Sequence, residues 1–205
     1  MDKALYTDGE KLLDAAPCSV EMPAGTGKTH LLAAAAAIAG EKNQRTLILT
    51  HTNAGVDAIR KRLRRFGVPT TKFRVDTITG WAFSLVRSYS VIANISVSDV
   101  PDWTKSDGYL SGATSVARSD AIAEVLSLSF DYLFVDEYQD CTLVLHEFIM
   151  ALVAAIPKSV ILGDRLQAIF TFAGPMATWD GHVAPNFPEH ALDLSRTAGL
   201  ATTLT

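Results

Sequence analysis

Short apolar runs alternate with longer stretches of helical pattern along the whole chain. This alternation is typical of a parallel sheet covered by helices on both faces, and it predicts the α/β class. Two of the runs, 132–137 and 159–164, are almost continuously apolar and end in acidic residues, as expected for strands buried on both faces. The predicted strands are 19–22, 46–51, 72–77, 132–137, 159–164 and 190–195.

Helices are predicted between these strands. The run of leucine and alanine after residue 28 predicts a buried helix over 28–39, because these residues are strong helix formers. Asn53 is a candidate N-cap for a helix that reaches about Arg65. Further helices are predicted over 79–88 and 142–155. Residues 90–116 are rich in Ser, Asp and Gly, and we interpret them as a short insertion or long loop within a single domain.

Composition excludes several classes of protein. A chain of 205 residues fits one large domain, and 48% hydrophobic with 20% charged residues is ordinary for a globular protein. The two cysteines offer no disulfide framework, the five histidines are scattered without metal-ligand spacing, and the apolar run 31–40 is too short to span a bilayer. We therefore expect a cytoplasmic protein with no membrane partner.

Net charge limits any contact with nucleic acid to local basic patches, because the formal charge is −4. The one concentrated basic segment is RKRLRR at 60–65. Two interpretations of it remain open: it follows a phosphate backbone, or it is a solvated helix end whose cations suit the negative dipole terminus.

The segment MPAGTGKTH at 22–30 has the spacing of a phosphate-binding P-loop. Glycines let the backbone N–H groups approach a polyphosphate, Lys28 would neutralise the outer phosphates, and the Thr29 hydroxyl would ligate Mg²⁺. The loop opens the predicted helix 28–39, so the positive end of that helix faces the anion. Residues expected to contact the nucleotide are Pro23, Ala24, Gly25, Thr26, Gly27, Lys28, Thr29 and His30.

Acidic and amide side chains follow the two apolar strands. In a parallel sheet, ligands bind outside the carboxyl ends of the strands, where the P-loop and the ends of 132–137 and 159–164 would meet. Asp136 is expected to hold Mg²⁺, and Glu137 to orient or deprotonate the attacking water. Gln167 comes just beyond the next strand, from where its amide could reach the γ-phosphate or that water.

Six segments in order, taken together, resemble the first RecA-like domain of superfamily 1 DNA helicases of the UvrD/Rep/PcrA type. The resemblance covers nearly the whole chain, and DEYQD and GDRLQAIF are its most specific parts. The segments are MPAGTGKTH, LTHTNAGVDAIRKRL (49–63), VDTITGWAF (75–83), FVDEYQD (134–140), LGDRLQAIFTFAG (162–174) and LDLSRT (192–197).

The resemblance implies a set of roles and ligands. It implies ATP and Mg²⁺ as cofactors, with Thr29 and Asp136 on the metal and Glu137 as the catalytic base. Gln167 would couple the γ-phosphate to the DNA-facing surface, and Arg196 would reach the γ-phosphate. Single-stranded DNA is the implied partner, and the residues that would face it are His51, Thr52, Asn53, Thr77, Thr79 and Phe172.

Several positions depart from the family pattern. Met22 stands where the first glycine of the P-loop motif is usual. Glu10 stands where an adenine-reading glutamine is expected, and a carboxylate cannot donate to the adenine N7. Glu10 also fits a capping box with Thr7, so both interpretations stay open. Ser195 replaces a stacking aromatic, which predicts relaxed base selectivity. His51, Thr79, Phe172 and Ala173 replace an aromatic, a histidine, a tryptophan and an arginine, respectively.

The family uses a second RecA-like domain to close the ATP cleft and supply an arginine. The chain ends at Thr205, so this half is expected from a longer chain or from a partner protein, and the domain alone is expected to hydrolyse ATP poorly. The alternative function is a nucleotide-dependent switch that binds NTP without processing DNA. A nucleoside kinase is disfavoured, because DEYQD and GDRLQAIF do not fit that class.

Overall fold

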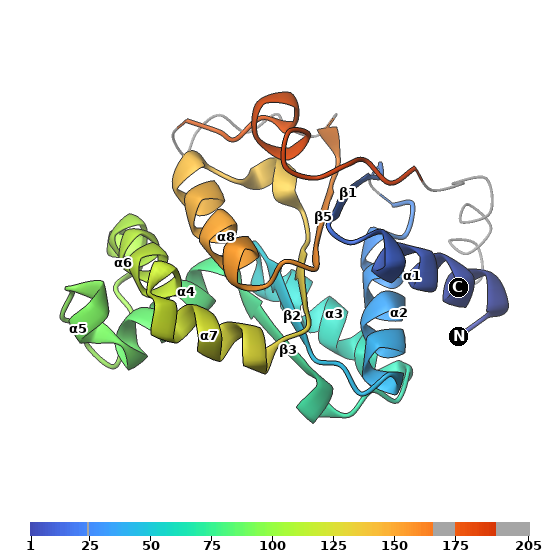
Figure 1. The fold of residues 1–205 in the computed structure, drawn as a ribbon, viewed down its shortest axis with the longest axis horizontal. Coiled ribbons are helices and arrows are strands. Elements are labelled where there is room, and N and C mark those ends of the chain that lie inside the picture. The colour runs from blue at the N-terminus through green and yellow to red at the C-terminus, as the bar shows by residue number, and fades with distance from the viewer. Residues whose placement is uncertain (24, 166–174, 192–205) are drawn as a thin grey trace.

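Five parallel strands form one sheet in a computed structural model of the chain, which describes residues 1–23, 25–165 and 175–191 (Figure 1). The strand order is β1-β5-β4-β2-β3, and every neighbouring pair is parallel. The strands are β1 (Cys18–Glu21), β2 (Thr46–Thr50), β3 (Phe73–Thr77), β4 (Tyr132–Val135) and β5 (Ser159–Gly163). The predicted α/β class and five of the predicted strands are confirmed, and the fold is that of a RecA-like P-loop domain.

The sixth predicted strand, 190–195, falls mostly outside the described residues. The chain just before it does run parallel to β1, because Glu189 forms a bridge with Ser19 and the His190 N–H donates to the Ser19 carbonyl at 2.8 Å. The segment 175–191 thus reaches the β1 edge of the sheet after crossing above the carboxyl ends of the strands (Figure 1).

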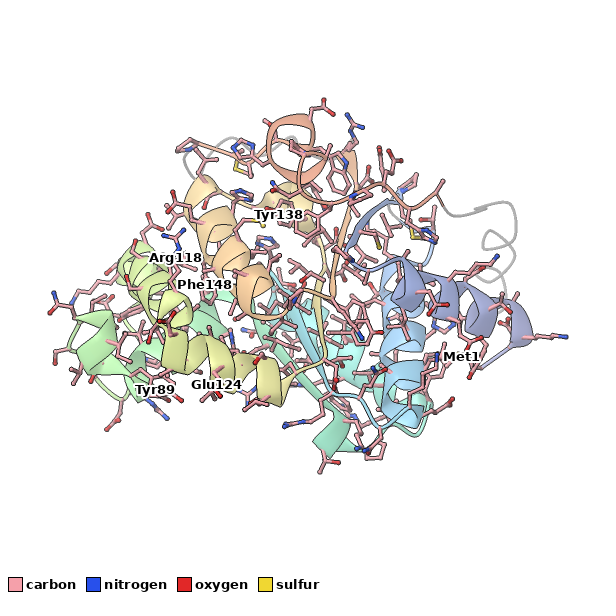
Figure 2. The ribbon with its side chains drawn as sticks, in the orientation of Figure 1. Met1, Tyr89, Arg118, Glu124, Tyr138 and Phe148 are labelled. Carbon is pink, nitrogen blue, oxygen red and sulfur yellow. The ribbon has the colours of Figure 1, made fainter. Side chains whose placement is uncertain are left out.

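Helices cover both faces of the sheet. Successive residues of a strand point to opposite faces, so Ile48 of β2 packs with α1, α2 and α3, whereas Leu47 and Leu49 pack with α4, α6, α7 and α8. Phe148 of α8 lies fully buried in this second layer (Figure 2). The helices are α1 (Lys3–Ala15), α2 (Lys28–Glu41), α3 (Asn53–Arg65), α4 (Ile78–Ser88), α5 (Ser90–Ala93), α6 (Ser106–Arg118), α7 (Asp120–Ser129) and α8 (Leu143–Ala155).

Helix α2 is buried around most of its circumference, as its run of alanine predicts. All residues from Leu31 to Ala39 are buried, because α1 covers the side of α2 that faces away from the sheet. Gly9 of α1 allows this approach: a Cβ there would lie 3.2 Å from the Ala35 nitrogen. The P-loop helix is thereby fixed between the sheet and α1.

Two predicted helix caps are wrong. Thr52, not Asn53, is the N-cap of α3: its Oγ1 accepts the Gly55 N–H at 3.0 Å, and Asn53 is the first helical residue. The capping box at Thr7 does not form either, because α1 begins at Lys3 and is capped by Asp2. Thr7 lies inside α1, where its hydroxyl donates to the Lys3 carbonyl.

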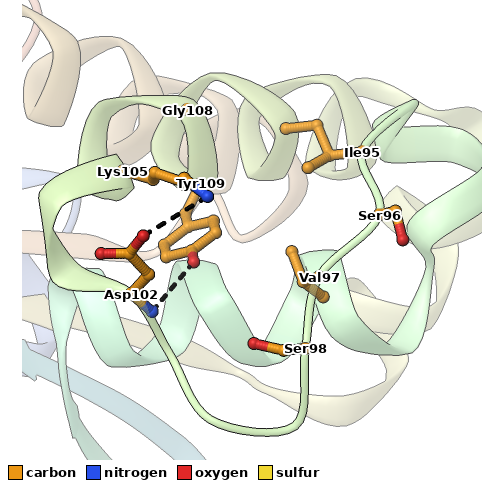
Figure 3. A pocket seen from close by; sticks show the side chains of 8 residues that line it. All are labelled: Ile95, Ser96, Val97, Ser98, Asp102, Lys105, Gly108 and Tyr109. Carbon is orange, nitrogen blue, oxygen red and sulfur yellow. Dashed lines mark hydrogen bonds and ion pairs between the residues drawn. The ribbon is translucent and has the colours of Figure 1, made fainter.

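The interpretation of 90–116 as a long loop is also wrong. Most of this region is helical, and α6 packs against α4 and α8 with Leu110, Ala113 and Val116 in the core. Between α5 and α6 the chain borders a hollow of about 440 Å³, where the Tyr109 hydroxyl accepts the Asp102 N–H (Figure 3). This hollow lies in the helical layer opposite α1 and α2.

Candidate nucleotide site

The P-loop joins β1 to α2 and contains two glycines with positive φ. Gly25 has φ 77° and Gly27 has φ 99°, values that side chains other than glycine rarely adopt. A Cβ at either position would meet no atom within 4 Å, so the backbone conformation is what requires glycine. Helix α2 begins at Lys28, directly after Gly27, so the positive end of its dipole faces the loop.

Lys28 lies inside the loop with only 5% of its surface exposed. Its Nζ donates to the Met22 carbonyl at 3.1 Å and lies 3.6 Å from the Glu137 Oε2. Met22 occupies the place of the usual first glycine, and its side chain is fully buried among those of α1 and α2. This position therefore contributes a side chain to the core and a carbonyl to the site.

Thr29 and Asp136 bring together two oxygen groups from distant parts of the chain. The Thr29 hydroxyl donates to the Asp136 Oδ2 at 3.4 Å, and Asp136, just after β4, is 2% exposed. Burial raises the pKa of Asp136 to about 6, and the neighbouring Glu137 carboxylate adds to this shift, while Lys28 and Thr29 oppose it. A hydroxyl beside a carboxylate is an oxygen pair of the kind that Mg²⁺ takes in nucleotide sites, so these two residues fit the metal.

Glu137 is held in an unusual backbone conformation. Its φ of 57° and ψ of 43° place it in the left-handed region, at a cost on the order of 1–3 kcal/mol for a residue other than glycine. Its N–H donates to the Asp136 Oδ1 at 3.0 Å, and its carboxylate accepts from the Gln139 Nε2 at 2.6 Å. This backbone directs the carboxylate of Glu137 toward Lys28, and Gln139 is a site residue that the sequence pattern did not single out.

Five of the six residues expected to face DNA lie at the carboxyl ends of two neighbouring strands. His51, Thr52 and Asn53 follow β2, and Thr77 and Thr79 lie where β3 passes into α4. The hydroxyls of Thr52 and Thr77 each accept a backbone N–H at 3.0 Å as N-caps of α3 and α4. A hydroxyl that accepts in this way keeps its own hydrogen to donate to a phosphate.

His51 connects this edge to the segment that follows β4. Its Nε2 lies 3.4 Å from the Sγ of Cys141, which is fully buried three residues beyond Tyr138. Burial lowers the pKa of His51 to about 4, so the ring is neutral at physiological pH, and the nearby Glu137 only partly offsets this effect.

The structure does not bring every predicted site residue to the P-loop. Glu10 pairs with Lys42 at 3.5 Å, and Lys42 follows the last residue of α2, whereas the P-loop precedes the first. The His30 ring packs against Phe66, with 5.4 Å between the ring centres. Four predicted site residues lie outside the described part of the chain, namely Ala24, Gln167, Phe172 and Arg196. Ser195 lies outside it as well.

The basic side chains of the segment 60–65 lie in two different environments. The Arg60 guanidinium donates to the Val75 carbonyl at 2.7 Å and so fastens α3 to β3. Lys61, Arg64 and Arg65, with Asp57, line an open hollow of about 510 Å³ on the outer surface of α3.

Comparison with known proteins identifies the family. No curated protein matches the chain. Within the described residues, no helix has both the length and the apolar character needed to cross a membrane. The family model AAA_19, described as an AAA domain, matches residues 9–173, a range that includes the P-loop, Asp136 and Glu137. The chain therefore belongs to this family and is a P-loop NTPase domain of the UvrD-like helicase kind.

Proposed function

We propose that this domain is the ATP-binding and ATP-hydrolysing half of a superfamily 1 DNA motor that acts on single-stranded DNA together with a second RecA-like domain. One observation carries the proposal. Lys28 and Thr29 meet Glu137 and Asp136 at 3.6 and 3.4 Å, although β5 separates the two strands that deliver them. This assembly contains a cation for phosphates, two oxygen groups for Mg²⁺ and a carboxylate for water.

Each of these groups has a defined task in phosphoryl transfer. Lys28 binds the outer phosphates, Thr29 and Asp136 would hold Mg²⁺, and Glu137 orients the attacking water and accepts its proton. Mg²⁺, when bound, neutralises charge on the phosphates. Because Lys28 already pairs with Glu137, incoming phosphates compete with that carboxylate for the ammonium group. Nucleotide binding thus releases Glu137 for its contact with water.

A nucleotide-dependent switch that does not process DNA is the second candidate. The contact of His51 with Cys141 favours it, because the side chain that stands at an aromatic DNA-contact position in the family is directed toward a buried thiol. The two candidates share the nucleotide chemistry and differ in their response to DNA.

Calorimetric titration with Mg²⁺ and a non-hydrolysable ATP analogue tests the nucleotide site. Lys28→Ala is expected to weaken binding at least tenfold, since it removes the only charge that the P-loop segment 22–30 presents to the outer phosphates. Lys11→Ala, an exposed lysine of α1, is the matched control and should bind as the wild type does. Equal affinity in the two variants would contradict the assignment of the P-loop.

Single-turnover hydrolysis of labelled ATP, with protein in excess, tests the reaction and separates motor from switch. Glu137→Gln should retain binding and lose about 10²–10⁴ in rate, as expected on removal of a general base. A single-stranded oligonucleotide should raise the wild-type rate if the domain belongs to a motor. A rate that does not respond to the oligonucleotide, even with the second domain supplied, would favour the switch.

A further inference from the structure

A buried amide joins the carboxylate of Glu137 to the end of β5. Gln139 lies in the 3₁₀ turn Tyr138–Asp140 and is 7% exposed. Its Nε2 donates to the Glu137 Oε2 at 2.6 Å, and its Oε1 accepts the Asp164 N–H at 3.0 Å. The amide nitrogen of Gln139 thus binds the proposed base, and its amide oxygen binds the backbone just after β5, the strand that lies between β1 and β4.

The chemistry of these partners fixes the orientation of the amide. A backbone N–H such as that of Asp164 can only donate, so the oxygen of Gln139 must face it. The nitrogen is then left for Glu137, whose ionised carboxylate can only accept. The amide therefore recognises Glu137 in the charged form that a general base requires, and a hydrogen bond of this kind is stronger than one between neutral groups.

Glycine at the end of β5 makes room for this contact. A Cβ on Gly163 would lie 3.2 Å from the Gln139 Oε1 and 2.7 Å from the ring of Trp179. On its other side, Arg165, two residues after the last residue of β5, pairs with Asp180 and, at 3.6 Å, with Glu21 at the end of β1. The end of β5 is thus a fixed point against which Gln139 can hold Glu137.

We propose that Gln139 is the positioning residue of the hydrolytic reaction, holding the Glu137 carboxylate in place and linking it to the end of β5. The inference rests on the proposed function, in which phosphates take Lys28 away from Glu137. Once Lys28 has moved to the phosphates, the hydrogen bond from Gln139 at 2.6 Å still holds the Glu137 carboxylate.

Gln139→Leu tests the proposal, since it keeps the bulk of the side chain and removes both hydrogen bonds. We expect single-turnover hydrolysis to fall about 10–10²-fold, the cost of a misplaced catalytic group, while the affinity for Mg²⁺ and the ATP analogue stays unchanged. Gln44→Leu makes the same chemical change at the amino end of the strands, before β2, whereas Gln139 lies beyond the carboxyl end of β4, and the variant should leave the rate unchanged. A wild-type rate in Gln139→Leu overturns the proposal.

Gln139→Glu provides a second variant that preserves size and the acceptor for Asp164. The introduced carboxylate repels Glu137 at pH 8, so the rate should fall, and it should recover relative to the wild type as the new group is protonated toward pH 5. The absence of this pH-dependent recovery would count against the positioning role.

A crystal structure of Gln139→Leu gives a readout that does not depend on activity. In crystals with Mg²⁺ and the ATP analogue bound, the Glu137 carboxylate should lie in a different place from that in the wild-type complex, and an unmoved carboxylate overturns the proposal even if the variant is slow. If the wild type binds Mg²⁺-ATP but hydrolyses it no faster than Glu137→Gln, the proposed hydrolysis fails, and this structure alone then decides the role of Gln139.

Discussion

Asp136 illustrates how burial at one residue sets a pH dependence. Its pKa of about 6 in the folded protein lies above the ordinary value of 3.8, chiefly because burial disfavours the charged form. Between about pH 4 and 6 the folded protein holds a proton that the unfolded chain releases. The free energy of unfolding therefore decreases as the pH rises through this window, and the deficit persists above it.

Asp136→Asn should remove this deficit. At pH 8 and without Mg²⁺, we expect the variant to be more stable than the wild type by about 2–3 kcal/mol, from a shift of about two pKa units. Near pH 3 the two proteins should unfold at the same temperature, because that pH lies below both pKa values and the wild-type carboxyl is then largely protonated in both states. Thermal unfolding measured across this pH range checks the prediction.

The variant and the wild type are compared at the same pH, so that the contributions of all other titrating groups to the free energy of unfolding cancel. His51, with its pKa lowered to about 4, acts in the opposite direction: its contribution is lost as the pH falls from about 6.5 to 4. Asp14→Asn, on the exposed side of α1, is the control for the loss of a carboxylate at the surface. A gain in stability for Asp136→Asn that is the same at pH 3 and pH 8 would contradict the assignment.

At the scale of single residues, the sequence predicts chemical types better than partners. MPAGTGKTH and DEYQD identify Lys28 and Glu137 without any coordinates, because phosphates and water need those residue types. They do not reveal that Glu137 adopts a left-handed backbone or that Gln139 reaches Asp164. Such contacts depend on which strands become neighbours, and the strand order is not encoded in any one segment.

At the scale of elements, two glycines in helices offer a matched test of packing. Gly9 faces α2, where a Cβ would lie 2.7 Å from the Ile38 Cδ1 and 3.2 Å from the backbone nitrogen of Ala35. Gly108 lies in α6, and a Cβ there would meet nothing within 4 Å. Replacement by alanine gives both helices the same gain in helix propensity, so any difference reports the contact between α1 and α2.

We expect Gly9→Ala to destabilise the protein by about 1–3 kcal/mol, the usual cost of overpacking, because backbone atoms of α2 cannot move aside as a side chain can. Gly108→Ala should stabilise it by about 0.5–1 kcal/mol. Chemical denaturation of both variants measures these free energies. If Gly9→Ala is as stable as Gly108→Ala, the close approach of α1 to α2 is not as described.

The sequence predicts the buried strands of the sheet, but it does not predict a helix such as α6 that is stabilised mainly by packing against other helices. The strand β4 is apolar throughout and β5 is apolar from Val160 to Leu162, because both faces of the sheet are covered, so their sequence alone identifies them. Helix α6, with sequence SDGYLSGATSVAR, is rich in Ser and Gly, which are weak helix formers, so its sequence alone predicts a loop. Its small residues instead allow close packing: a Cβ on Gly112 would lie 3.2 Å from Val86 of α4.

At the scale of the whole molecule, two surfaces are alternative binding sites for single-stranded DNA in the proposed motor. The first is the edge formed by the ends of β2 and β3, with His51, Thr52, Asn53, Thr77 and Thr79. The second is the basic hollow of Lys61, Arg64 and Arg65 near the end of α3. Thr52 precedes the first residue of α3 and Arg65 is its last, so these surfaces lie at opposite ends of a helix of 13 residues, about 20 Å long.

The proposed motor would bind DNA at the strand-end edge, and we expect the α3 surface to contribute only general charge. Cations at the end of α3 already have a role there: Arg64 Nε donates to the Arg60 carbonyl at 3.3 Å, and their charge suits the negative end of the helix dipole. Exposed charges beyond the Debye length of about 10 Å at 0.1 M salt are largely screened from DNA at the other end of the helix.

Fluorescence anisotropy with a labelled single-stranded oligonucleotide, measured over a series of salt concentrations, distinguishes the two surfaces. Phe172→Ala, at the position that the resemblance assigns to base stacking, should cost about 1–3 kcal/mol of binding free energy. Changing Lys61, Arg64 and Arg65 together to glutamine should weaken binding no more than changing Arg87, Lys105 and Arg118, because both triple variants alter the net charge equally. If the α3 variant instead lowers the salt slope by about 2, as expected for three lost phosphate contacts, DNA follows α3 and the strand-end edge is not its binding surface.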